Sequence, residues 1–202
     1  QMRRIAIAAA LALAVHALGL STDALAQGRF DPRREARFMV DANIGYTLIS
    51  GSVGDSISGG PGAEASVLYQ IGSVPLRVGG GAGYSRHNLQ NKDGAASRFD
   101  VFALMDVLLF SDETQMIPYL QARVGWMQLS DNADDISTKI SGLEIAALAG
   151  VDMPVAESIS IDISGLFGCF TGGDYTVDCV SSPGTSRSGS LFGIRAGAFF
   201  FF

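Results

Sequence analysis

Charged side chains recur at alternate positions of this chain, inside segments whose other positions are apolar. Seven acidic residues and three arginines share one face of that alternation: Asp41, Glu64, Asp100, Asp106, Glu144, Asp152, Asp162, Arg77, Arg123 and Arg195. Charges gathered in a narrow interior must be paired or hydrogen-bonded, because an unpaired buried charge is costly. We predict an ion-pair network that plugs such an interior. A narrow conducting channel is the alternative, and its acidic excess would make it prefer cations.

One serine and one histidine are spaced for nucleophilic chemistry. Ser85 and His87 are two positions apart, and in a strand they would share a face, where a histidine could serve a serine as base. This pair makes an enzyme that modifies lipid A a third hypothesis. On the predicted strand, however, both side chains belong to the inward face, away from lipid chains. The sequence "SRHN" also matches no deacylase motif. We therefore predict a rim or loop histidine, no catalytic residue and no enzyme.

The chain has two cysteines, Cys169 and Cys179, and an even count in an exported protein predicts a disulfide. We expect the link to staple a loop. The acidic triplet Asp131, Asp134 and Asp135 could attract a divalent cation that bridges lipopolysaccharide phosphates, but an isolated acidic loop is usually solvated. We therefore predict neither a metal site nor a cofactor.

Period-two alternation predicts that strands carry these residues. In "RFMVDANIGYTL" the apolar set Phe38, Val40, Ala42, Ile44, Tyr46 and Leu48 alternates with Met39 and with polar or small residues. Seven further segments show the same two faces: 64–71, 77–85, 99–107, 120–126, 143–152, 159–167 and 192–202. Eight such segments in one chain predict an all-β protein, an antiparallel up-and-down barrel.

The links between these segments alternate in length. The first ("ISGSVGDSISGGPG"), the third ("RHNLQNKDGAAS"), the fifth ("SDNADDIST") and the seventh, about residues 169–189, are the long ones. The links "GSVP", "SDETQMI" and "PVAES" are shorter. Transmembrane barrels have short periplasmic turns and longer extracellular loops. The pattern therefore predicts four long extracellular loops and periplasmic termini.

The N-terminal segment has the features of an export signal. Arg3 and Arg4 precede an apolar run from Ile5 to about Val15, and Ala24-Leu25-Ala26 has the pattern of a cleavage site. We predict a cleaved signal at 1–26, a periplasmic tail at 27–37 and a barrel at 38–202. Removal of 1–26 leaves 12 basic and 19 acidic residues, a net charge of −7. An acidic exported chain is a poor candidate for binding nucleic acid.

A soluble barrel and a membrane barrel both fit simple alternation, and they differ in which face is outside. Aromatic residues of the apolar set gather near both strand ends: Tyr46, Tyr84, Phe99, Trp126 and Phe167 toward the long loops, and Phe38, Tyr69, Phe200 and Phe202 toward the short turns. Two such belts suit the two interfaces of a bilayer. The many glycines of the other set suit a crowded lumen. We therefore predict the membrane barrel.

The last segment, "GIRAGAFFFF", resembles the terminal strand of bacterial outer-membrane proteins. That resemblance implies recognition by the barrel-assembly machinery, with Phe200 and Phe202 as the signal. Phe199 and Phe201 break the alternation, so they either plug the periplasmic mouth or mark an irregular last turn.

Together with "PYLQARVGW" and "AALAGVDMPVAESISIDISGLF", the pattern resembles the small eight-stranded outer-membrane barrels that include opacity proteins and the barrel domain of outer-membrane protein A. The resemblance covers about 38–202. It implies a monomeric, multi-pass barrel in the outer membrane, in contact with its lipid and lipopolysaccharide. The implied role is structural or one of surface interaction of an adhesion-like kind, with the loops as the working surface for any ligand.

Overall fold

The computed structural model describes residues 37–51, 57–71, 74–89, 94–109, 116–133, 136–156, 158–177 and 180–202, and their side chains except within 131–138 and 173–187. The predicted signal at 1–26 and nearly all of the predicted tail at 27–37 lie outside these residues. No helix among the described residues is long and apolar enough to cross a membrane.

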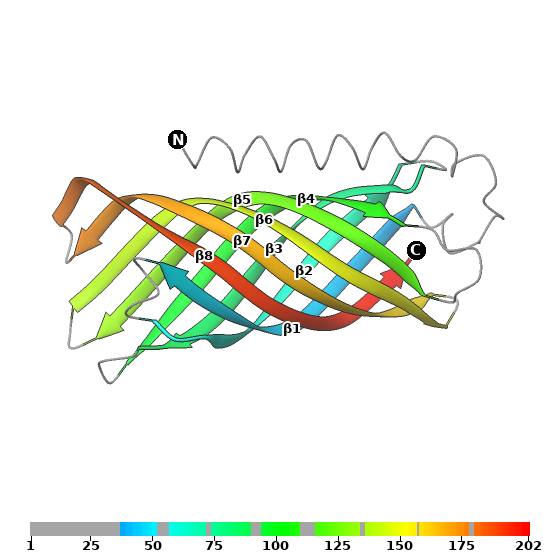
Figure 1. Ribbon diagram of the computed structural model, residues 1–202, viewed down its shortest axis with the longest axis horizontal. Coiled ribbons are helices and arrows are strands. Elements are labelled where there is room, and N and C mark those ends of the chain that lie inside the picture. The colour runs from blue at the N-terminus through cyan, green and yellow to red at the C-terminus, as the bar shows by residue number, and fades with distance from the viewer. Residues whose placement is uncertain are drawn as a thin grey trace. The chain divides into compact units, whose positions relative to one another are not determined.

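The described residues form eight antiparallel strands that close into a barrel (Figure 1). The strands are β1 (Phe38–Gly51), β2 (Gly60–Gln70), β3 (Leu76–Asn88), β4 (Ala95–Leu108), β5 (Ile117–Ala133), β6 (Ile136–Ala156), β7 (Ile159–Val177) and β8 (Val180–Phe201). Each strand pairs with its neighbours in the chain, and β8 pairs with β1 from Met39↔Phe201 to Gly51↔Gly189. The predicted fold class, an all-β up-and-down barrel, is confirmed.

The alternation in the sequence decides which side chains point outward. In β1 the side chains of Val40 and Ile44 are exposed on the outer wall, whereas those of Met39, Asp41 and Asn43 are buried inside. The apolar set therefore lies outside, and the soluble alternative, which needs it inside, is wrong. Soluble proteins rarely expose a continuous apolar surface of this extent. The wall is built to contact lipid.

The two ends of the barrel differ. The terminal end holds both ends of the described chain and the links β2–β3, β4–β5 and β6–β7, and the hairpin end holds the other four links. Exposed aromatic side chains ring the wall near each end: Tyr46, Tyr84, Phe99, Trp126, Phe167 and Phe192 toward the hairpin end, and Phe38, Tyr69, Phe200 and Phe202 toward the terminal end. Rings at two depths match the two interfaces of a bilayer.

Two of the four predicted long loops are largely strand. β5 and β6 approach to Ala133 and Ile136, and β7 and β8 approach to Val177 and Val180, so both links are extended hairpins (Figure 1). The prediction of a loop over about 169–189 is therefore wrong. Serine, glycine and aspartate favour turns, but a paired partner strand offers each backbone group a hydrogen bond, and pairing outweighs the weak local preference.

Cys169 belongs to one of these hairpins. It lies within β7, paired with Ile145 on one side and Ser190 on the other, and its side chain is free and exposed on the outer face. The expectation that this cysteine sits in a loop is wrong. Cys179 lies outside the described residues, so the predicted disulfide gains no support.

Two apolar clusters lie inside the barrel, one toward each end. The terminal-end cluster is Met39, Leu68, Phe102, Leu104, Phe199 and Phe201. The hairpin-end cluster is Ile49, Ile57, Ala96, Met127, Leu129, Ile140, Leu148, Leu166, Phe170 and Leu191. Phe199 and Phe201 therefore point into the lumen, which is the plugging arrangement of the two that the sequence left open. Along β8, Arg195 lies between Leu191 of one cluster and Phe199 of the other.

Candidate functional site

The ten charged residues singled out from the sequence all point into the lumen. Nine of them are buried, and the Glu64 side chain is 14% exposed. Some of them lie between the two apolar clusters: along β1, Asp41 separates Met39 from Ile49, and along β4, Asp100 separates Ala96 from Phe102. Asp106 lies beyond Leu104 of β4, nearer the terminal end. The charged residues form two groups, which differ in the ratio of carboxylates to arginines.

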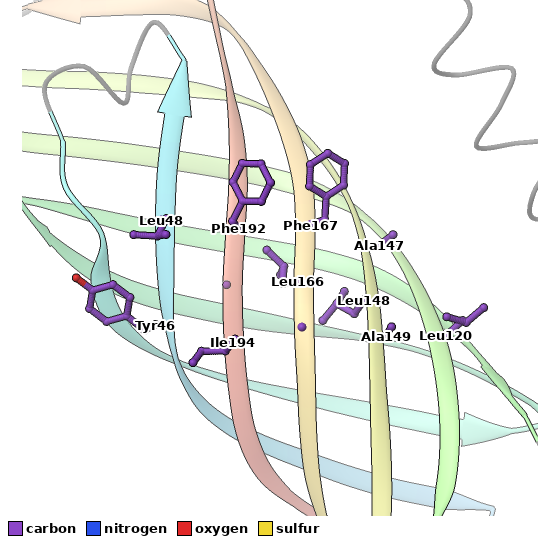
Figure 2. Close-up of a pocket in the computed structure, with 12 residues that line it drawn as sticks. Tyr46, Leu48, Leu120, Ala147, Leu148, Ala149, Leu166, Phe167, Phe192 and Ile194 are labelled. Atoms are coloured by element: carbon purple, nitrogen blue, oxygen red, sulfur yellow. The ribbon is translucent and has the colours of Figure 1, made fainter.

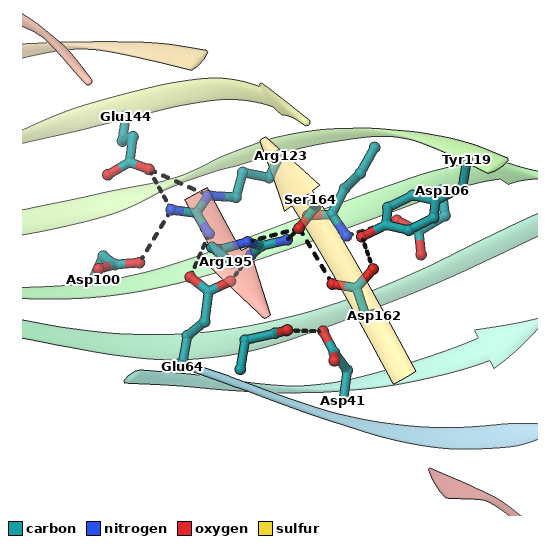
Figure 3. Close-up of polar contacts among 12 residues, drawn as sticks. Asp41, Glu64, Asp100, Asp106, Tyr119, Arg123, Glu144, Asp162, Ser164 and Arg195 are labelled. Carbon is teal, nitrogen blue, oxygen red and sulfur yellow. Dashed lines mark hydrogen bonds and ion pairs between the residues drawn. The ribbon is translucent and has the colours of Figure 1, made fainter. Parts of the chain in front are cut away.

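The first group, here called the six-charge network, pairs three carboxylates with three guanidinium groups: Glu64, Asp100, Glu144, Arg98, Arg123 and Arg195. Arg123 lies at its centre, with N–O distances of 2.9 Å to Glu64 and 2.8 Å to Glu144 (Figure 3). Arg195 also pairs with Glu64. The network is neutral in formal charge, so the low dielectric of the lumen strengthens its attractions with no net charge left over.

Arg98 belongs to this network and is missing from the sequence prediction. Its Nη2 atom lies 2.6 Å from Glu144 and 3.2 Å from Asp100. The predicted strand began at Phe99, whereas β4 begins at Ala95. The signal was present, because residues 98 and 100 have the same parity and must share a strand face.

The second group, here called the aspartate group, contains Asp41, Asp106, Asp152 and Asp162. Their charges are close enough to interact with one another. Arg77 lies 3.6 Å from Asp152. Among the described lumen residues this group therefore has four carboxylates and one arginine, and it carries the acidic excess of the lumen.

Neutral donors satisfy part of the aspartate group. The Tyr119 hydroxyl donates to Asp162 over 2.7 Å, and Gln121 Nε2 donates to Asp106 over 2.8 Å. The Ser164 hydroxyl donates to Asp162 and accepts from Arg195, which links the two charged groups (Figure 3). Tyr119 was also missing from the sequence prediction, although it has the inward parity of Gln121.

Lumen glycines make room for these side chains. A Cβ atom at Gly83 would lie 2.9 Å from a carboxylate oxygen of Asp100, and one at Gly150 would lie 2.6 Å from the Tyr119 ring. Any larger residue at either position would displace a member of the charged groups. The glycines are therefore part of the lumen packing.

Arg77 joins the aspartate group to the terminal-end cluster. Its guanidinium carbon lies 5.3 Å from the centre of the Phe199 ring and 5.9 Å from that of Phe201, both within cation–π range. Phe199 and Phe201, the last two inward residues of β8, thus pack against Arg77, the arginine that faces the aspartate group. This contact gives the broken alternation of "AFFFF" a structural reason.

Ser85 and His87 lie inside the barrel. The Ser85 hydroxyl is 2.8 Å from His87 Nε2, and His87 Nδ1 is 3.1 Å from the Ser58 carbonyl. A carbonyl only accepts, so Nδ1 carries the proton, and for a neutral ring Nε2 accepts from Ser85. His87 is fully buried, so the prediction of a rim or loop histidine is wrong. Its burial also keeps this pair from lipid, as parity indicated.

The space beside the six-charge network is small. Beside the six-charge network lies a cavity of about 30 Å³, lined by Asn43, Glu64, Ser85, Arg98, Asp100 and Arg195 among others. That volume has room for one or two water molecules. With an apolar cluster on either side, this arrangement suits a plug rather than an aqueous pore.

Metal-ligating groups do not converge in the described part of the chain: no set of three or more His, Cys, Asp or Glu side chains there could hold a metal ion. Asp134 and Asp135 of the acidic triplet lie outside the described residues. Asp131 is described by its backbone alone, which pairs with Ala96 and Thr138.

Solved structures of bacterial surface and outer-membrane proteins resemble this barrel. Neisserial surface protein A (NspA) aligns with a TM-score of 0.61 and 19% identity over 82% of this chain and 97% of that chain. OprG of Pseudomonas aeruginosa aligns with a TM-score of 0.58 and 9% identity over 82% of this chain and 95% of that chain. The chain has the fold of the small outer-membrane barrels. At these identities the likeness shows the fold, as the sequence resemblance predicted, and it supports the predicted outer-membrane location. No family model and no curated protein matches the sequence.

Replacing Arg123 with methionine should destabilise the barrel. The change leaves Glu64 and Glu144 with one guanidinium partner fewer in a buried site, and breaking a buried ion pair costs about 3–5 kcal/mol. Urea unfolding of the barrel refolded into lipid vesicles would measure the loss. The control is Arg86→Met, because Arg86 is exposed on the outer side of β3. Equal midpoints for the parent and Arg123→Met would contradict the network.

The two charged groups should respond in opposite ways to loss of a carboxylate. Asp100→Asn removes charge from the balanced network and should lower the urea midpoint. Asp41→Asn keeps an oxygen that can accept from Asn43 and removes one charge from the crowded aspartate group. Its midpoint should equal or exceed that of the parent, and a fall as large as that of Asp100→Asn would show that the acidic excess is not where we place it.

Proposed function

We propose that this chain is a non-conducting outer-membrane barrel of structural or surface-interaction, adhesion-like type, with the hairpin end on the cell surface. The observation that carries the proposal is the asymmetry of the barrel. Buried ion pairs and two apolar clusters line its lumen, and at one end β7 and β8 continue well past the aromatic ring.

The length of β7 and β8 supports the surface role. β7 runs ten residues beyond Phe167, and β8 starts twelve residues before Phe192. At about 3.3 Å per residue these extensions are longer than half of the roughly 25 Å apolar band of a membrane barrel. A hairpin of this length places paired backbone above the membrane, where another molecule could contact it.

The plug argues against a pore, and the burial of Ser85 and His87 argues against an enzyme that modifies lipid A. The partners we propose are membrane lipid and lipopolysaccharide around the wall, and a surface ligand on the hairpins. The barrel-assembly machinery is a third partner, which would read Phe200 and Phe202 during insertion of a monomer. Both side chains are exposed at the terminal end of β8 and so are available to an assembly factor.

Shortening the β7–β8 hairpin tests the surface role. Residues 174–183 would be replaced by Asn-Gly, and the matched control would shorten the β5–β6 hairpin by replacing 132–137 in the same way. The barrel should fold in each case, because the removed pairs lie beyond the wall. Cells that display the β7–β8 variant should adhere to epithelial monolayers no better than cells without the protein.

Two results would count against the proposed function. One is full adherence of cells that carry the variant with the shortened β7–β8 hairpin. The other is discrete, reproducible current steps from the parent barrel in planar lipid bilayers at high salt, because a plugged lumen should conduct no ions. Neither measurement needs knowledge of the ligand.

The terminal phenylalanines test the proposed assembly signal. Phe202 is outward and Phe201 is inward, with exposures of 74% and 8%. Phe202→Lys should cost little in refolding, because a lysine near the interface costs about 0–1 kcal/mol, yet it should sharply lower the protease-resistant barrel in outer membranes. Phe201→Ser should show the opposite: a larger loss in refolding than in the amount of protease-resistant barrel in outer membranes. Near-parental insertion of both variants in cells would remove the assembly role.

A further inference from the structure

A hydrophobic groove of about 610 Å³ lies on the lipid-facing wall across β5, β6, β7, β8 and β1 (Figure 2). Its lining is almost entirely hydrocarbon. Register explains how it forms, because one row of outward residues crosses the wall in the order Leu120, Ala149, Gly165, Ile194 and Tyr46. The two smallest side chains stand together in the middle of that row, and larger ones stand at its ends.

The floor of the groove is open above Gly165. A Cβ atom built there would have no other atom within 4 Å. One row nearer the hairpin end, Phe167 and Phe192 face each other with ring centres 5.1 Å apart and form the upper rim (Figure 2). The large rings of Phe167 and Phe192 project beyond Gly165, so the depression has a defined edge on this side.

The groove continues along the wall. A second depression of about 1020 Å³ shares Tyr46, Ala149, Gly165 and Ile194 with the first and extends toward the terminal end past Ile163 and Ala196. Because they share these four residues, the two depressions form one elongated trough on the wall. An unbranched chain fits such a shape better than a globular ligand does.

We propose that this trough is a preferred site for one acyl chain of a membrane lipid, an inference that rests on the membrane placement of the wall. The trough is continuous with the lipid-facing surface, where acyl chains are the molecules at hand. A chain lying in it contacts hydrocarbon along its length, whereas a chain spanning the depression loses those dispersion contacts. The Tyr46 hydroxyl lies at the edge, within the hairpin-end aromatic ring, where it can donate to the ester of the same lipid (Figure 2).

The test uses the full chain in phosphatidylcholine vesicles that contain a phosphatidylcholine with a diazirine midway along one acyl chain. After illumination, mass spectrometry maps the cross-links. Labelling should concentrate on the β7–β8 strip around Phe167, Phe192 and Ile194, relative to outward positions of β3 and β4. Ala149→Leu fills the floor and should lower labelling of that strip several-fold.

Ala103→Leu is the matched control, because Ala103 is exposed mid-strand on β4, outside the trough. It should leave the labelling pattern of the parent unchanged. Both variants face lipid, so each should refold to a protease-resistant barrel, which is verified before labelling.

Three results would overturn the proposal. Labelling spread evenly around the wall, or lowered equally by both variants, would mean that the trough selects no chain. Labelling of the strip that falls as the protein density in the vesicles is raised would mean that a second copy covers it. Labelling by a diazirine-bearing free fatty acid together with none by the phospholipid would assign the trough to a different ligand.

Discussion

Backbone hydrogen bonding in hydrocarbon is the constraint on which this structure depends. Inside a bilayer no water can pair with an unsatisfied N–H or C=O group, so a sheet that crosses it must have no free edge. The pairing of β1 with β8 over thirteen register positions, from Met39↔Phe201 to Gly51↔Gly189, removes the edge. The last residues of β8 are thereby held in the wall, which accounts for the phenylalanines among them.

Closure creates a second problem, because it encloses a narrow, nearly dry interior. Eight strands leave a lumen that side chains can just fill. In this chain, buried charged side chains and two apolar clusters share the lumen. Three guanidinium groups matched to three carboxylates form a neutral cluster, and the Ser164 hydroxyl connects it to the acidic remainder. The apolar clusters then limit the access of water to the ion pairs and keep their attraction strong.

Much of the fold was predictable because strand parity is a strict rule. Asp41, Glu144 and Arg195 could be placed on the face opposite the apolar set from parity, since every second side chain must share a face, and the aromatic belts then indicated that this face lines the lumen. Strand ends were less predictable, because they depend on pairing with another strand. Cys169 lies in a part of β7 that local composition marked as loop, and Arg98 lies just before the predicted start of its strand. His87 was expected at a rim for the same reason.

Contacts between strands could not be predicted from the sequence. The trough depends on Ala149 and Gly165 being neighbours across β6 and β7, and a shift of register by one position would separate them. Similarly, Tyr119 of β5 reaches Asp162 of β7 past the intervening strand β6. Such meetings are set by the stagger of the closed barrel, which no local pattern encodes.

The central claim is that the apolar face of each strand contacts lipid while the other face lines a filled lumen. Spin labels at each position from 145 to 149 of β6, one at a time in vesicles, test it most directly, because the inward residues Ala146 and Leu148 are uncharged. Collision with oxygen dissolved in the bilayer should be high at 145, 147 and 149 and low at 146 and 148. A flat or inverted pattern would contradict the account.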